Sequence, residues 1–185
     1  MKEIKEITLI IVGEWNIKIF TPIWMLNVLL DVKDKNEEIN IGFTNNDLKL
    51  FYTYKNVTFA PSEKIFSIRF TDINDTTKEI ATKAAIKLFS TLSYTPNIAV
   101  GFNYTVEQNY DVSNIELPFF NQFYKLNEIK LTKEENNFTV NVILNNNQKN
   151  IVSYNFHFNN DKLSFINENS INEHLNYLQS QWEQI

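Results

Sequence analysis

Apolar and polar residues alternate along much of the first half of the chain, which is the pattern of β-strands. Residues 4–15 show it first, with Ile7, Leu9 and Ile11 on one face, and a partly apolar second face that is typical of a central strand. Residues 16–20 are expected to continue this strand after a bend at Gly13. Further strands are predicted over 39–43, 48–54, 57–60 and 64–70, separated by turn signals at 45–46 and 60–61.

The strand predicted over 97–106 has two unlike faces. Large apolar residues occupy alternate positions from 98 to 106, whereas Ala99, Gly101 and Asn103 form a face of small and polar residues. Such a face leaves room for a helix, another backbone or a ligand. A second series of strands follows over 126–131, 138–144, 150–158 and 163–166, while residues 112–124, interrupted by Pro118, fit neither period.

Three helices are predicted, a short buried one over 23–32 and two amphipathic ones over 76–91 and 170–182. Their start signals are Thr21-Pro22 for the first, and capping boxes of Thr76 with Glu79 and of Ser170 with Glu173 for the others. The elements together predict one α+β domain over residues 1–185, a mainly antiparallel meander sheet covered by these helices. No repeat with a period of 20–50 residues is visible.

Composition removes several kinds of chemistry. The 185 residues are 43% apolar and include no cysteine, two histidines and three isolated glycines. Absent cysteine excludes disulfides, thiolate zinc sites and a cysteine nucleophile, and isolated glycines cannot build a phosphate loop. We therefore expect no cofactor and no metal, and we favour a binding protein over an enzyme.

Charge and hydropathy limit the partners. The net charge is −5 with one arginine, which argues against nucleic acid because phosphate contacts need clustered basic residues. No window reaches the roughly 18 apolar residues of a membrane span, and the apolar stretch over 7–12 is too short for a signal-peptide core. We expect an acidic, cytoplasmic protein whose partner is another protein; the sequence also allows a homo-oligomer.

Four residues are candidates for a binding site: Trp15, Asn16, Arg69 and Asn103. Arg69, the only arginine, suits a clamp on a carboxylate or phosphate, although a solvent-facing strand residue paired with an acid fits the pattern as well. Trp15 and Asn16 follow the bend at Gly13, and Asn103 lies on the small-residue face. We interpret these three residues as parts of the core architecture; the alternative is that they belong to an exposed binding surface, where such residues anchor a partner.

The two histidines are expected to be surface or internally satisfied residues rather than catalysts. His157 alternates to the polar side of its strand, and His174 is placed near the polar side of the final helix. Their wide separation along the chain gives no reason to pair them.

Two segments carry a resemblance. Residues 13–24 read G-x-W-N-x-x-I-F-x-P-x-W, and residues 94–103 read Y-T-P-x-x-x-x-G-x-N. This pair of motifs resembles a family of uncharacterised bacterial proteins, in which a histidine takes the place of Tyr94 and a proline that of Ile17. The resemblance implies a bacterial, single-domain protein. It transfers no catalytic residue.

Three functions fit these observations. The first is a non-enzymatic protein-interaction module, such as an accessory, adaptor or immunity-type protein of a bacterial conflict or defence system, acting by shape and charge. The second is a small-ligand-binding protein or hydrolase with a pocket between the sheet and the 76–91 helix, lined by Ala99, Gly101 and Asn103 and anchored by Arg69. The third is a phage- or secretion-related assembly subunit that pairs exposed strand edges.

Overall fold

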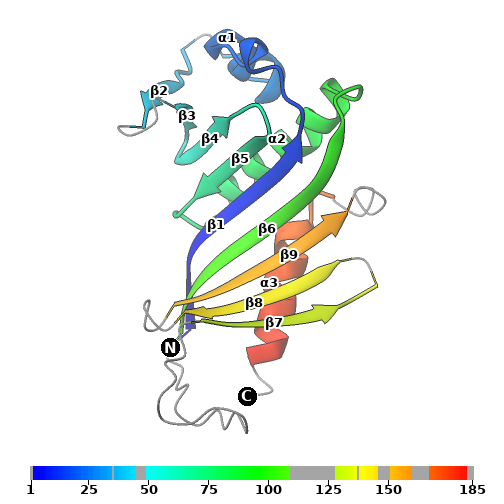
Figure 1. The fold of residues 1–185 in the computed structure, drawn as a ribbon. Coiled ribbons are helices and arrows are strands. Elements are labelled where there is room, and N and C mark those ends of the chain that lie inside the picture. The colour runs from blue at the N-terminus through cyan, green and yellow to red at the C-terminus, as the bar shows by residue number, and fades with distance from the viewer. Residues whose placement is uncertain are drawn as a thin grey trace, which may run out of the picture.

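Nine strands form one sheet in the computed structural model, which describes residues 2–34, 36–44, 49–108, 128–136, 138–145, 151–159 and 167–182. The strand order is β2-β3-β4-β5-β1-β6-β9-β8-β7 (Figure 1), and every neighbouring pair is antiparallel. The α+β class with a mainly antiparallel sheet is thus confirmed. The strands are β1 (Lys2–Gly13), β2 (Asn40–Phe43), β3 (Leu50–Tyr54), β4 (Val57–Pro61), β5 (Ile65–Phe70), β6 (Asn97–Gln108), β7 (Glu128–Glu134), β8 (Thr139–Asn145) and β9 (Ile151–Asn159).

The helical elements differ from the sequence prediction in detail. After β1 the chain forms a short 3₁₀ turn, η1 (Ile17–Ile19), where continued strand was expected. Thr21 caps α1 (Pro22–Trp24) as predicted, since its Oγ1 accepts from the Trp24 backbone N–H at 3.2 Å. A π-helical segment, η2 (Met25–Leu29), follows and ends three residues before the predicted limit.

The two longer helices are α2 (Asp75–Thr91) and α3 (Ser170–Trp182). α2 begins one residue earlier than predicted because its capping box consists of Asn74 and Thr77, not Thr76 and Glu79. Within the described part of the chain, no helix is long and apolar enough to cross a membrane. The predictions over 112–124 and 163–166 lie outside the described residues.

Both long helices lie on the same face of the sheet, α2 behind β5 and β1 and α3 behind β7 to β9 in Figure 1. Among the described residues, the sheet therefore has one face covered by helices and one face without helices, which we call the helix-covered and helix-free faces. On β1, the completely buried Ile7, Leu9 and Ile11 belong to the same core as Ala84 and Leu88 of α2. Alternate residues of the strands point to the other face because successive side chains of a strand point in opposite directions.

The sheet contains two four-stranded units with the same strand connections, and β2 extends the first unit by pairing with β3. In the first unit β1 pairs with β5, β5 with β4 and β4 with β3, and α2 follows β5. In the second unit β6 pairs with β9, β9 with β8 and β8 with β7, and α3 follows β9. The first strands of the two units, β1 and β6, pair with each other at the centre, where Thr8 lies opposite Asn103.

Candidate binding face

A single row of polar residues crosses the helix-free face from one edge of the sheet to the other. Strand register places one member on each strand, each directly opposite the next. We call this set the polar row; in spatial order it is Asn40, Thr53, Thr58, Arg69, Thr8, Asn103, Asn155, Asn141 and Thr132.

Cross-strand hydrogen bonds join two pairs of members in the second half of the polar row. Asn155 Nδ2 donates to Asn103 Oδ1 between β9 and β6, and Thr132 Oγ1 donates to Asn141 Oδ1 at 2.8 Å between β7 and β8. Directly opposite side chains on neighbouring strands stabilise a sheet through such contacts. The amides of this half are thereby fixed in orientation on the face.

The first half of the polar row contains an ion pair. Arg69 Nε lies 3.4 Å from Glu6 Oε2, and Thr8 Oγ1 donates to Glu6 Oε1 at 3.1 Å. Glu6 thus holds two members of the row near the centre of the sheet. The Arg69 side chain remains 60% exposed, so its guanidinium is accessible from solvent.

Gly101 makes room for the amide of Asn155 in the polar row. A Cβ at this position would lie 3.2 Å from Asn155 Nδ2, which is closer than ordinary van der Waals contact allows without a shift. The predicted small-residue face of β6 therefore accommodates side chains of the neighbouring strand β9.

The small-residue face of β6 points away from α2. Ala99, Gly101 and Asn103 alternate with Val100 and Phe102, and Phe102 contacts His174 of α3. The small residues consequently lie on the helix-free face, together with Arg69. The sequence predicted a pocket lined by these residues between the sheet and the 76–91 helix. This prediction is wrong, because the residues lie on the helix-free face and the helix lies on the opposite side of the sheet.

Trp15 and Asn16 take structural positions away from the polar row. Trp15 is 4% exposed and packs edge-on against Phe20 and Phe66, so it is a core residue and not an exposed anchor. Its indole Nε1 has no hydrogen-bond partner among the described residues. Asn16 is exposed and caps η1, accepting from the Lys18 backbone N–H at 3.2 Å.

The two histidines occupy opposite sides of the sheet. His157 pairs with Gly101 in register and lies on the helix-free face, as predicted. His174 is 3% exposed, which corrects its expected place near the polar side of α3. Its Nδ1 lies 2.9 Å from Tyr104 Oη and its ring stacks on Phe156. Burial lowers the pKa of His174 to about 3, so the imidazole is neutral.

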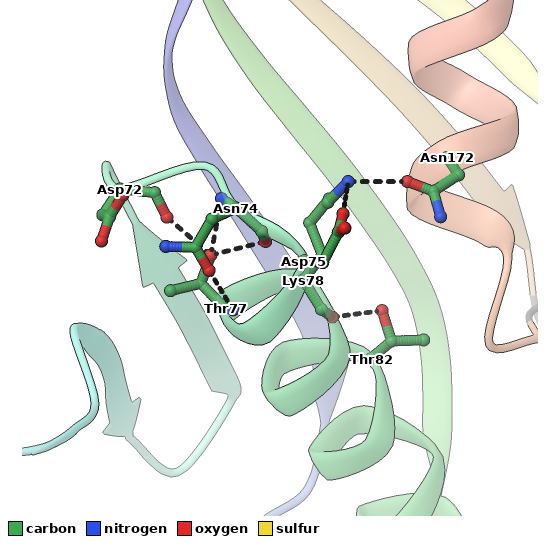
Figure 2. A network of polar contacts seen from close by, with 7 residues as sticks. All are labelled: Asp72, Asn74, Asp75, Thr77, Lys78, Thr82 and Asn172. Carbon is green, nitrogen blue, oxygen red and sulfur yellow. Dashed lines mark hydrogen bonds and ion pairs between the residues drawn. The ribbon is translucent and has the colours of Figure 1, made fainter.

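A second polar cluster, shown in Figure 2, lies at the start of α2 on the helix-covered side. Asn74 Oδ1 accepts from the Thr77 backbone N–H at 3.0 Å. Lys78 Nζ lies 2.7 Å from Asp75 Oδ1 and donates to Asn172 Oδ1 at 3.1 Å. The last bond joins α2 to α3, so this cluster fastens the two units to each other.

An open cavity of about 280 Å³ adjoins this cluster and is lined by the first turns of α2 and α3. Lys78 of the lining pairs with Asp75, and Lys83 pairs with Glu79; Glu168 is the third acid of the lining. Across the described ranges, no group of three His, Cys, Asp or Glu side chains is placed to hold a metal ion.

Of the four predicted site residues, the structure brings together Arg69 and Asn103, which both lie opposite Thr8 on neighbouring strands. The other members of the polar row carried no individual signal in the sequence, because only the strand register aligns them. Comparison with protein-family models and with curated proteins finds no match to this chain. The resemblance of residues 13–24 and 94–103 to a bacterial family stays a prediction.

Proposed function

We propose that the protein is a non-enzymatic protein-interaction module that receives its partner on the helix-free face, along the polar row. The biological setting that we propose is a bacterial conflict or defence system, where the chain would serve as an accessory, adaptor or immunity-type protein. The observation that carries the proposal is the continuous polar row across all strands of the sheet.

The length of the polar row favours a macromolecule over a small ligand. Strands lie about 4.8 Å apart, so a row over nine strands extends roughly 40 Å. Small-molecule sites are instead concave and have a few polar groups converging on one point. Hydroxyl and amide groups spread over this distance match the scale of a protein interface, which has about one hydrogen bond per 100–200 Å².

Charge suggests what the partner presents. The chain carries a net charge of −5, which favours association with a basic protein through complementary fields. At the centre of the polar row, the exposed guanidinium of Arg69 offers one site for a carboxylate of that partner. Arginine is also among the residues that most often dominate binding energy at interfaces.

The test begins with capture of the partner. The tagged full chain is used to isolate a stoichiometric partner from the native host, and the purified partner is titrated against the wild type and Arg69→Ala. We expect Arg69→Ala to weaken binding about tenfold or more. The matched control is Lys87→Ala, because Lys87 is exposed on α2 on the opposite side of the sheet.

Two results would contradict the proposal. One is the absence of any stoichiometric protein partner. The other is a partner whose affinity falls for Lys87→Ala and not for Arg69→Ala, since that would place the interface on the helix-covered side.

A second candidate function, an assembly subunit that pairs strand edges, is favoured by one observation. The sheet ends at β2 in a strand without charged residues. A solution mass that grows beyond two chains as the concentration rises would distinguish this function from the first.

A further inference from the structure

The two outer strands of the sheet differ in their protection against pairing. β7, at one edge, has four charged residues among its seven, Glu128, Lys130, Lys133 and Glu134. β2, at the other edge, has the sequence Asn-Ile-Gly-Phe and no charge. Charged side chains on an edge strand oppose pairing with another chain. Only β7 has this protection.

β2 also presents apolar side chains to solvent. Ile41 is 50% exposed and Phe43 is 61% exposed. Both lie on the helix-covered side of the sheet, since Ile41 is directly opposite the buried Tyr52. On the other side, the ring of Phe51 occupies the place where a side chain at Gly42 would begin. β2 thus has exposed apolar side chains on the helix-covered side of the sheet, and on the helix-free side the Phe51 ring fills the space beside Gly42.

The chemistry of this edge specifies an extended polypeptide as its occupant. β2 pairs with β3 on one side, and no described strand pairs with its other side. In an antiparallel strand about half of the N–H and C=O groups point to each side. Those on the outer side match the backbone of a further strand, and the exposed Ile41 and Phe43 would be covered by apolar residues of that strand.

We infer that this occupant is the β2 strand of a second copy of the chain, paired antiparallel about a two-fold axis. With Gly42 on the axis, Ile41 lies opposite Phe43 of the partner subunit, so the exposed apolar residues of both copies cover each other. The strand carries no charge, so self-pairing brings no like charges together within it. The interface is isologous, as in most homodimers.

The contrast between the two edges predicts that assembly stops at two copies. Pairing of β2 with its counterpart uses the unprotected edge of each copy. The edges that remain are the two β7 strands, both charged. A closed dimer results, whereas two unprotected edges would permit an open fibre. Because β2 has only four residues, the interface is smaller than the roughly 1,200–2,000 Å² of stable complexes, and the dimer is expected to be weak and reversible.

Sedimentation equilibrium of the full chain tests this inference. Over about 10 μM to 1 mM protein, we expect the mean mass to rise by mass action from that of one chain, 21.8 kDa, toward twice that value. Ile41→Lys adds a charge to the edge and should weaken association about tenfold or more. The matched control is Leu131→Lys, which changes a residue of β7 that is 55% exposed and should leave association unchanged.

A chain that stays monomeric over the whole range overturns the inference. Dimerisation that Leu131→Lys weakens and Ile41→Lys does not also overturns it. Circular dichroism of both variants checks that the fold is retained. The inference is independent of the partner on the helix-free face, because Ile41→Lys is expected to bind that partner with unchanged affinity.

Discussion

The two units of the sheet share their strand connections and differ in how they form the core. In the first unit, α2 packs with the small side chains Ala81, Ala84 and Ala85, all at most 1% exposed. In the second, His174 of α3 lies among aromatic rings, with the centroid of Phe156 at 4.2 Å and that of Phe102 at 4.9 Å. The same strand topology is thus packed by small side chains in one unit and by aromatic rings in the other. The polar row on the opposite face continues across both units.

The largest expected effect comes from removing a ring of the second unit. Phe156 is fully buried and contacts His174, Tyr104 and Phe138. Phe156→Ala should lower the free energy of unfolding by about 3–5 kcal/mol, because it removes buried apolar area and leaves a cavity. Urea denaturation measures the change. A loss below about 1 kcal/mol would show that the aromatic cluster is not tightly packed.

The first unit should respond instead to added volume. Ala85 is 1% exposed in the interface between α2 and the sheet, so Ala85→Leu should cost about 1–3 kcal/mol of unfolding free energy through overpacking. Lys87→Leu, at an exposed position of the same helix, is the matched control and should change stability by about 0.5 kcal/mol or less. Equal effects of the two substitutions would contradict close packing of α2.

The second unit should also make stability depend on pH. The pKa of His174 is lowered from 6.5 to about 3 by burial, so below pH 6.5 the unfolded chain binds a proton that the folded chain does not. The free energy of unfolding should therefore fall by about 1.4 kcal/mol for each unit by which the pH decreases between pH 6 and pH 5.

Urea denaturation at several pH values measures this slope. His174→Phe should remove it, since the replacement fits the aromatic surroundings and does not titrate. His157→Gln, on the helix-free face, should retain it. A slope that survives in His174→Phe would assign the pH dependence to other groups.

The smallest effect concerns the start of α2 in the first unit. Asn74→Ala removes a side chain that accepts from the Thr77 backbone N–H at 3.0 Å and should cost about 1 kcal/mol. Asn74→Ser keeps a capping oxygen and should retain most of the stability. Thermal unfolding compares the two, and equal melting temperatures for Asn74→Ala and the wild type would show that the cap does not contribute.

Local patterns in the sequence predict the strands and miss their alignment. The alternation around Ile7, Leu9 and Ile11 correctly indicates β1, and it extends through the buried Gly13 to Trp15, which is the signal that Trp15 belongs to the core. Strand order and register depend on contacts between distant residues. The polar row therefore could not be predicted, although Arg69 and Asn103 were selected individually.

The position of His174 illustrates a signal that was present and misinterpreted. It lies three residues after Ile171 and four before Leu178, both buried, so helical periodicity places it on the same stripe. Because histidine was counted as a polar residue, His174 was predicted to lie near the polar side of the helix. Its partner Tyr104 is 70 residues away in sequence, so no local pattern could show that the buried imidazole would be hydrogen-bonded.

The central claim is that a protein partner docks on the helix-free face along the polar row. Site-specific photo-crosslinking in the native host tests it most directly, with the crosslinking residue placed at Thr58 on the helix-free face or at Lys87 on α2. We predict a covalent adduct with one partner protein from position 58 and none from position 87. An adduct from position 87 alone, or from neither position, would contradict the claim.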